Sequence, residues 1–426
     1  MVRTLALFVV FSLPAYPALS APPASQIPFE QATRDLTSAD AGTRLRAVQL
    51  LKDAAYPEAA LPIAPLVTDP RDDIQLEAIA AELNIFLAQK IVTRKKIAGV
   101  VEVRTAVVAD AAFSAGPLVL GSRPVPFEVL TALRTGARDD NPRVGLEALY
   151  AFGTLAGEPS GSVRRALLAA AGPDLAAMVG VADPALRFAA VRVLGRVFAW
   201  RPQDEAIEPT VGDAVIAALN DRDRAVRQAA MDALGAMRYE RAVQALTDLF
   251  RYFGNGALAA ASLDAIAHIA HASSVPVLTA QLMSKNTALK VMAIEGLARA
   301  GDTSKYADIQ AASGGERSDA VLLAGNFASV ALGGGSLDPL AEALTRSKVH
   351  DQAQQYLTEL APGRSAAYQR FLQDPDARIR ASVVDARALS YDAAALPSVE
   401  ALLNDKDPQV VRAAERAAAR LRALAN

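Results

Sequence analysis

The sequence predicts an all-α protein, a right-handed α-solenoid of about twelve stacked helical hairpins. Three observations lead to this fold class. A pattern of about thirty residues recurs along the 426-residue chain. Hydrophobic residues make up 52% of the chain but aromatic residues only 5%, which suits thin cores between closely spaced helices. The 25 glycines and 24 prolines are close to an average content and do not indicate disorder.

The first twenty residues have the arrangement of a secretory signal peptide. Arg3 supplies a positive start, an uncharged apolar run covers 5–13, and small residues precede a cleavage point after Ser20. The apolar run is too short to cross a bilayer as a helix, so we expect no stable membrane insertion. The signal predicts a periplasmic or secreted protein.

The remainder of the chain divides into a leader and one repeat domain. The leader covers 21–28, contains three prolines and is expected to be flexible. The repeats cover 29–426, and their length varies most over about 103–210. The chain has no cysteine, which excludes disulfides and thiol catalysis.

Each repeat begins with a helix start signal. An aspartate, often followed by proline, precedes an apolar anchor residue. An arginine usually comes directly after the anchor, and alanines come three and four positions after the anchor. The clearest copies begin at Asp183, Asp221, Asp374 and Asp407. The aspartate is expected to cap the helix, and the apolar spacing makes one buried stripe. Gly195 and Gly235 occur where we expect a left-handed turn to end the helix.

The anchor residues form a ladder that runs to the end of the chain. They are Thr43, Ile74, Val103, Val144, Leu186, Val226, Leu258, Leu289, Val321, Val349, Ile379 and Val411. A shorter amphipathic helix follows each first helix, for example over 396–403. Because two such helices cannot bury their apolar faces alone, neighbouring units must stack.

This pattern resembles the HEAT repeat, in particular its short class, which is also seen in bilin-lyase-like proteins. The resemblance covers about 28–426, and the signal peptide adds the character of an exported protein of bacterial type. It implies an α-solenoid. It does not imply one activity, because HEAT arrays serve many unrelated roles.

Three successive units are about ten residues longer than the others, and their extra loops predict a lobe at one edge of the solenoid. The additions cover about 115–126, 157–162 and 200–209. Tryptophan and arginine are favoured anchors at protein interfaces. The residues we expect to contact a partner are Arg123, Trp200, Arg201 and Asp204. The alternative is a tolerated loop insertion, with Trp200 packed under its own loop.

The histidines are the main candidates for catalysis. Asp264, His268 and His271 are spaced four and three apart, so they share one helix face that in principle suits a metal. Other repeats carry charged residues at the same register, so we interpret these positions as solvent-facing. The HEAT-like di-iron hydroxylases carry paired His-Glu motifs, which the sequence lacks. We therefore expect no metal and no cofactor.

The charge pattern bears on partners. The formal net charge is −2, which does not favour nucleic acid. An arginine recurs directly after the anchor. Its copies are Arg104, Arg187, Arg227, Arg380 and Arg412. We interpret these arginines as a ladder of ion pairs with the recurrent aspartates, rather than as anion-binding groups.

These observations predict a non-catalytic protein–protein interaction scaffold in the cell envelope or exterior, whose partner is another protein. The alternative from a different class is an enzyme or enzyme subunit, lyase-like, with its site in the lobe of inserted loops.

Overall fold

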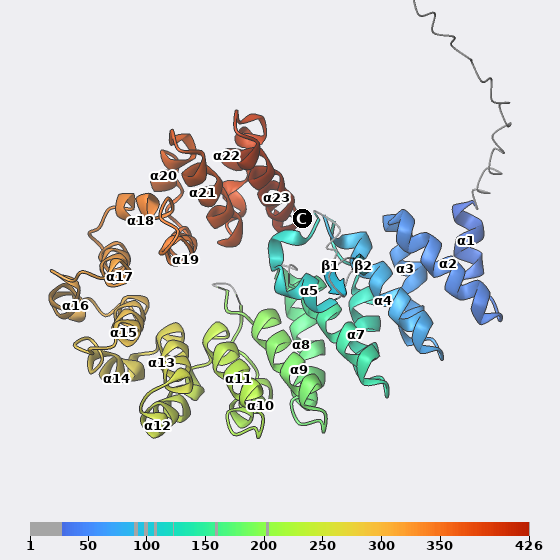
Figure 1. Cartoon of the computed structure of the whole chain (residues 1–426), viewed down its shortest axis with the longest axis horizontal. Coiled ribbons are helices and arrows are strands. Elements are labelled where there is room, and N and C mark those ends of the chain that lie inside the picture. The colour runs from blue at the N-terminus through green and yellow to red at the C-terminus, as the bar shows by residue number, and fades with distance from the viewer. Residues whose placement is uncertain are drawn as a thin grey trace, which may run out of the picture.

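The structure is a computed structural model that describes residues 28–88, 93–97, 101–105, 109–121, 123–157, 161–201 and 204–425. The predicted signal peptide and the leader up to residue 27 lie outside the described residues. The described part of the chain is a curved array of helical pairs (Figure 1). The predicted all-α solenoid is confirmed.

Each pair consists of a first and a second helix, and in the middle of the array the first helix lies on the concave side and the second on the convex side (Figure 1). The first helices are α2 (Ala41–Ala54), α4 (Asp72–Phe86), α7 (Pro142–Leu155), α9 (Pro184–Val197), α11 (Arg224–Ala236), α13 (Ala257–Ile269), α15 (Thr287–Arg299), α17 (Asp319–Ala331), α19 (His350–Leu360) and α21 (Ala377–Leu389). The second helices are α3 (Ala60–Ile63), α6 (Phe127–Gly136), α8 (Gly161–Met178), α10 (Pro209–Ala218), α12 (Val243–Phe253), α14 (Val275–Thr279), α16 (Tyr306–Ser313), α18 (Asp338–Ala343), α20 (Ser365–Tyr368) and α22 (Leu396–Glu400). Helices α1 (Phe29–Asp35) and α23 (Pro408–Ala425) flank these pairs.

The anchor at Val103 is wrong, and so is the unit that it defines. Val103 lies in strand β2 (Val101–Thr105), which pairs antiparallel with β1 (Thr93–Ile97). Apolar residues there alternate with polar ones, which is the two-residue period of a strand. This hairpin and helix α5 (Ala109–Ser114) form one long insertion between α4 and α6. The described residues therefore hold ten helical pairs rather than about twelve.

The other anchors are placed as predicted, each within a first helix or directly before one. Successive first helices contact one another, and buried apolar side chains form one continuous core from Ala32 to Leu421. Helix α23, which follows the last pair, covers the C-terminal end of this core with its buried side chains. None of the helices in the described ranges is long and apolar enough to cross a membrane.

The two repeat glycines do not end their helices in a left-handed turn. Gly195 lies inside α9 and Gly235 inside α11, and neither has a positive φ. A Cβ atom at Gly195 would stand 2.9 Å from the Cα atom of Ala233 on the next first helix. These glycines are therefore needed for the close approach of neighbouring helices.

Two of the recurrent arginines pair with aspartates of the next unit, as predicted, whereas Arg227 donates to the carbonyl oxygen of Asp221. Arg187 bonds Asp221 with a shortest distance of 2.7 Å, and Arg380 bonds Asp405 at the same distance. The Arg380 side chain is 4% exposed and also donates to the carbonyl oxygen of Asp374. Arg104 lies in strand β2 rather than in a first helix.

A second aspartate in each of these loops caps the next helix. Asp223 accepts from the backbone N–H of Ala225 at 2.6 Å, while Asp221 two residues earlier holds Arg187. The predicted cap at Asp183 is confirmed, with 2.7 Å to the N–H of Ala185. The caps predicted at Asp221 and Asp374 are wrong, because the aspartate two residues later caps each of those helices. One aspartate thus joins two units and the other starts a helix, which fixes the stacking geometry.

The array curves until its C-terminal unit meets its middle. Helix α23 contacts the short 3₁₀ turn η3 (Pro117–Val119) of the long insertion. The ring of Tyr391, between α21 and α22, lies 4.1 Å from the guanidinium carbon of Arg201. Segments almost two hundred residues apart in sequence therefore form one surface.

A buried carboxyl lies in the core of the N-terminal part. Glu82 on α4 is fully buried, and neither carboxyl oxygen has a hydrogen-bond partner among the described residues. Burial raises the pKa of Glu82 well above its ordinary value of 4.5. Because this carboxyl ionises at lower pH in the unfolded chain than in the native one, its contribution to stability is most favourable below about pH 4.5 and is lost as pH rises through the native pKa.

We expect Glu82→Leu to stabilise the protein at pH 8 by about 1–3 kcal/mol, the desolvation penalty of an unsatisfied buried polar group. The variant should also lose much of the fall in stability between pH 5 and pH 8. Thermal unfolding at both pH values measures the effect. A lower melting temperature at pH 8 would show that the native carboxyl is stabilised by a partner.

Candidate functional site

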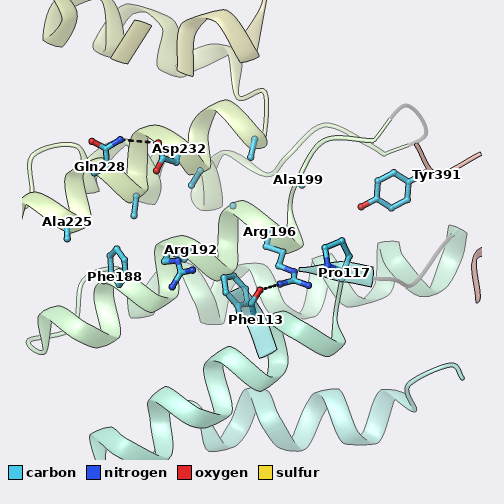
Figure 2. Close-up of a pocket in the computed structure, with 15 residues that line it drawn as sticks. Phe113, Pro117, Phe188, Arg192, Arg196, Ala199, Ala225, Gln228, Asp232 and Tyr391 are labelled. Atoms are coloured by element: carbon cyan, nitrogen blue, oxygen red, sulfur yellow. Dashed lines mark hydrogen bonds between the residues drawn. The ribbon is translucent and has the colours of Figure 1, made fainter. Parts of the chain in front are cut away.

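The best-formed cavity lies on the concave face, and we call it the concave pocket. It has a volume of about 700 Å³ and is lined by residues of α9, α11 and the long insertion, with Tyr391 at one end (Figure 2). This volume is within the range of about 300–1,000 Å³ that is typical of ligand sites. The pocket therefore combines the repeat scaffold with the parts of the chain that interrupt it.

One wall carries two arginines held by an aromatic ring. Arg192 and Arg196 are one turn apart on α9, and Figure 2 shows them on either side of the Phe113 ring from α5. Their guanidinium carbons lie 4.9 and 4.7 Å from the centre of that ring. Arg196 donates to the carbonyl oxygen of Phe113 at 2.5 Å, and Arg192 pairs with Asp110 at 3.2 Å. Cation–π contacts and hydrogen bonds thus position both groups.

The opposite wall is a helix with small side chains. Ala225, Ala229 and Ala233 of α11 line the pocket, beside Gln228 and Asp232. Gln228 donates to the Asp232 carboxylate at 3.2 Å (Figure 2). Desolvation raises the pKa of Asp232, and the nearby Asp264 adds to the rise. This wall is therefore mostly apolar, and its carboxyl holds its proton more tightly than usual.

Tyr391 brings the C-terminal unit to the pocket. Its ring is contacted by two cations, with Arg201 at 4.1 Å and Arg420 at 5.0 Å from the ring centre. Arg420 also donates to the carbonyl oxygen of Ala388 at 3.0 Å. Tyr391 has a φ of 57°, in the left-handed region that few tyrosines occupy. The contact that closes the array thus also forms one end of the pocket.

The predicted partner-binding residues have different environments. Arg123 is exposed. Trp200 is 45% exposed, and the Arg238 guanidinium stacks over its ring at 4.0 Å. Arg201 is only 6% exposed, donates to the carbonyl oxygen of Gly157 and contacts Tyr391. Asp204 bonds the buried Arg164 at 2.8 Å. Arg201 therefore serves a contact within the chain, and only Arg123 and Trp200 are exposed as an anchor requires.

The inserted loops do lie together. Gly157 and Arg201, from the second and third loops, are joined by the hydrogen bond just described. Pro117 of the first loop lines the same pocket as Gly157, and just before this loop Phe113 accepts from Arg196 of α9. The C-terminal unit then packs against this group, through α23 on η3 and through Tyr391. The lobe is thus partly covered by its own chain.

The three residues considered and rejected as metal ligands do not converge. Asp264 and His268 lie on α13, 3.5 Å apart, but His271 lies beyond its end and faces Glu240 at 3.5 Å. Among the described residues no group of three or more potential ligands could hold a metal ion. Burial alone would lower the pKa of His268, but the bond to Asp264 outweighs it and the pKa is raised.

The register interpreted as solvent-facing lies on the concave side, where Asp232 is exposed as expected but Glu295 is buried. His268 approaches Gln355 of α19 at 3.2 Å between nitrogens. Arg299, at the same register of α15, is 3% exposed and bonds Glu359 of α19 at 2.8 Å. It also pairs with Glu295 at 3.4 Å. Side chains of α13, α15 and α19 thus form a polar network across the inner surface.

Sequence reasoning missed the main pocket residues, although a signal was available. Arg192 and Arg196 occupy the same register as Asp264 and His268, so a repeat alignment puts both pairs on one face. Nothing periodic indicates Phe113 or Tyr391, because both lie outside the regular helices of the ladder or at their ends.

The family comparison agrees with the repeat architecture. Residues 172–252 match the family described as HEAT repeats. An engineered protein is 19% identical, with 92% of this chain and 98% of that chain covered and a TM-score of 0.40. A designed armadillo repeat protein in complex with the peptide (KR)4 is 16% identical, with 64% and 98% covered and a TM-score of 0.37.

Two further comparisons complete these findings. Kap95p, solved with RanGDP, is 15% identical, with 91% of this chain and 49% of that chain covered and a TM-score of 0.36. This chain thus spans about half of Kap95p. No curated protein matches the sequence.

Proposed function

We propose that this protein is a non-catalytic scaffold of the cell envelope or exterior that binds another protein on its concave face. The observation that carries the proposal is the concave pocket, which lies beside the exposed Trp200. The backbone N–H of Trp200 donates to the carbonyl oxygen of Ala236, a pocket residue, at 2.9 Å. Curved repeat arrays use such concave surfaces for binding, and the sequence of residues 1–20 supports export.

The position of the pocket also supports the alternative of an enzyme with its site among the inserted loops. A simple measurement distinguishes the two functions. Metal analysis of the purified mature protein should find no stoichiometric iron or zinc if the scaffold function is right. A stoichiometric metal would favour catalysis instead.

Trp200→Ala should weaken binding of the partner by about 2 kcal/mol if Trp200 is an interface hot spot. The melting temperature should change little, because the side chain is half exposed. Tyr252→Ala is the matched control, since Tyr252 is an 82% exposed aromatic residue of the convex helix α12. Titration calorimetry and thermal unfolding of both variants measure the two quantities. Unchanged affinity with lower stability would make Trp200 a packing residue.

A cross-linking experiment tests which face binds. A photo-reactive amino acid replaces Gln228 in the concave pocket or, as the control, Tyr252 on the convex side. The proposal expects one specific adduct from position 228 in intact cells and none from position 252. An adduct from position 252 alone would place the partner on the convex face and overturn the proposal.

A further inference from the structure

We propose that the concave pocket binds a short segment of the partner in which a large apolar side chain stands next to a carboxylate residue. The inference rests on the function proposed above and names the chemistry of the partner. It follows from two properties of the pocket that lie side by side, an apolar floor of small residues and a wall that carries two guanidinium groups.

The floor leaves space for a large side chain. It is made of Gly195 on α9 and of Ala229 and Ala233 on α11, all three of them buried. The half-buried ring of Phe188 stands beside them. Small residues on both helices keep the cavity open at about 700 Å³. An aromatic or branched aliphatic side chain would bury its apolar surface there, which is the main source of affinity in such pockets.

The charge of the lining is positive, although the whole chain has a net charge of −2. The charged residues that line the pocket are Arg192, Arg196 and Asp232. Two more guanidinium groups, those of Arg201 and Arg420, stand behind Tyr391. A carboxylate is therefore complementary to the wall, whereas a lysine or arginine would be repelled.

The guanidinium groups are also prepared for an anion. Both are stacked over Phe113, so binding costs little side-chain entropy. The forked guanidinium group of arginine can donate to both oxygens of a carboxylate, which adds directional hydrogen bonds to the charge attraction. Since Asp232 is on the opposite wall, the carboxylate of the segment should lie toward α5 and its apolar side chain toward α11. Tyr391 blocks one end, so the bound segment should be short.

The test selects octapeptides from a random phage-displayed library on the purified mature chain. We expect enriched peptides to carry an aromatic or leucine residue beside aspartate or glutamate. The best peptide, made synthetically, should bind at least tenfold more weakly when its acidic residue is replaced by lysine. The double variant Arg192→Met with Arg196→Met should lose at least tenfold in affinity, and the exposed convex Arg251→Met should lose none.

A second variant distinguishes a loss of binding from a folding defect in the double arginine variant. Ala225→Leu fills the pocket from an exposed position and keeps both arginines, so it should also weaken the peptide at least tenfold while the melting temperature stays unchanged. The inference would be overturned if basic peptides were enriched or if no peptide was enriched. It would also be overturned if both protein variants bound the peptide as tightly as the original chain does. Equally tight binding of free phenylacetate would also overturn it, because the pocket would then be a small-molecule site. If position 228 still cross-links a partner in these cases, the proposed function is retained and only the inference about the chemistry of the bound segment is rejected.

Discussion

Arg299→Met should destabilise the protein by about 3–5 kcal/mol, the cost of leaving buried charge without its partner. The Arg299 guanidinium bonds both oxygens of Glu359, at 2.8 and 3.0 Å, and pairs with Glu295. Its removal leaves two carboxylates beside each other on the inner surface. Because the pair joins α15 to α19 across α17, its loss should also loosen the curvature. Urea denaturation of the full mature chain measures the change.

The pH dependence of this effect has a definite sign. Burial alone would raise the pKa of Glu359, but Arg299 outweighs it and holds the pKa below the ordinary 4.5. The contribution of the pair is therefore fully present above about pH 4.5 and is lost as pH falls through the native pKa. The deficit of Arg299→Met should accordingly be smaller at pH 4 than at pH 7.

Two further variants control this result. Arg251→Met removes an arginine whose pair with Asp248 is largely exposed, so stability should change by no more than about 0.5 kcal/mol. Arg299→Met combined with Glu359→Gln should be less harmful than Arg299→Met alone, because one of the two unpaired carboxylates is gone. A loss below 1 kcal/mol for the single variant would mean that water already solvates the network.

Gly195→Val should cost about 3 kcal/mol, the upper end of the usual range for overpacking. Its Cβ would stand 2.9 Å from both the Cα and Cβ atoms of Ala233, so α9 and α11 would have to separate. The better helix propensity of a residue other than glycine recovers less than about 1 kcal/mol. Thermal unfolding measures the loss, and binding at the concave pocket should weaken with it, because Gly195 is part of the floor.

The matched control is Gly42→Ala in the first turn of α2. Its added Cβ would meet nothing closer than 3.4 Å, so the variant should gain up to about 1 kcal/mol from helix propensity. If Gly195→Val were as stable as the original protein, the helices would have room to move apart and the tight approach would not be a requirement.

The predictable part of the fold is the part that repeats. The anchors, the Asp183 cap and the pairs of Arg187 and Arg380 were predicted because each depends on contacts within one unit or between neighbours. Such contacts recur at a fixed spacing, so a clear copy of the repeat indicates which residues make the same contacts in the other copies. The errors lie where the pattern is interrupted. Val103 belongs to a strand, and Gly195 is placed by the width of the space between two helices rather than by its own backbone.

The candidate site was only partly predictable. The lobe of inserted loops was expected, and its loops do lie together, but Arg201 is buried where an exposed anchor was predicted. The reason is the Tyr391 contact, which no local pattern indicates. Trp200 is exposed as the partner hypothesis requires, and its role stays a prediction.

The sequence by itself therefore determined that this protein is an α-solenoid and how arginine and aspartate join neighbouring units. Only the tertiary structure decided that the array closes on itself and that a pocket forms where it does. The closure depends on the sum of small rotations over many units. It joins Arg201 to Tyr391, which no repeat spacing relates, and the same contact gives the pocket its end wall.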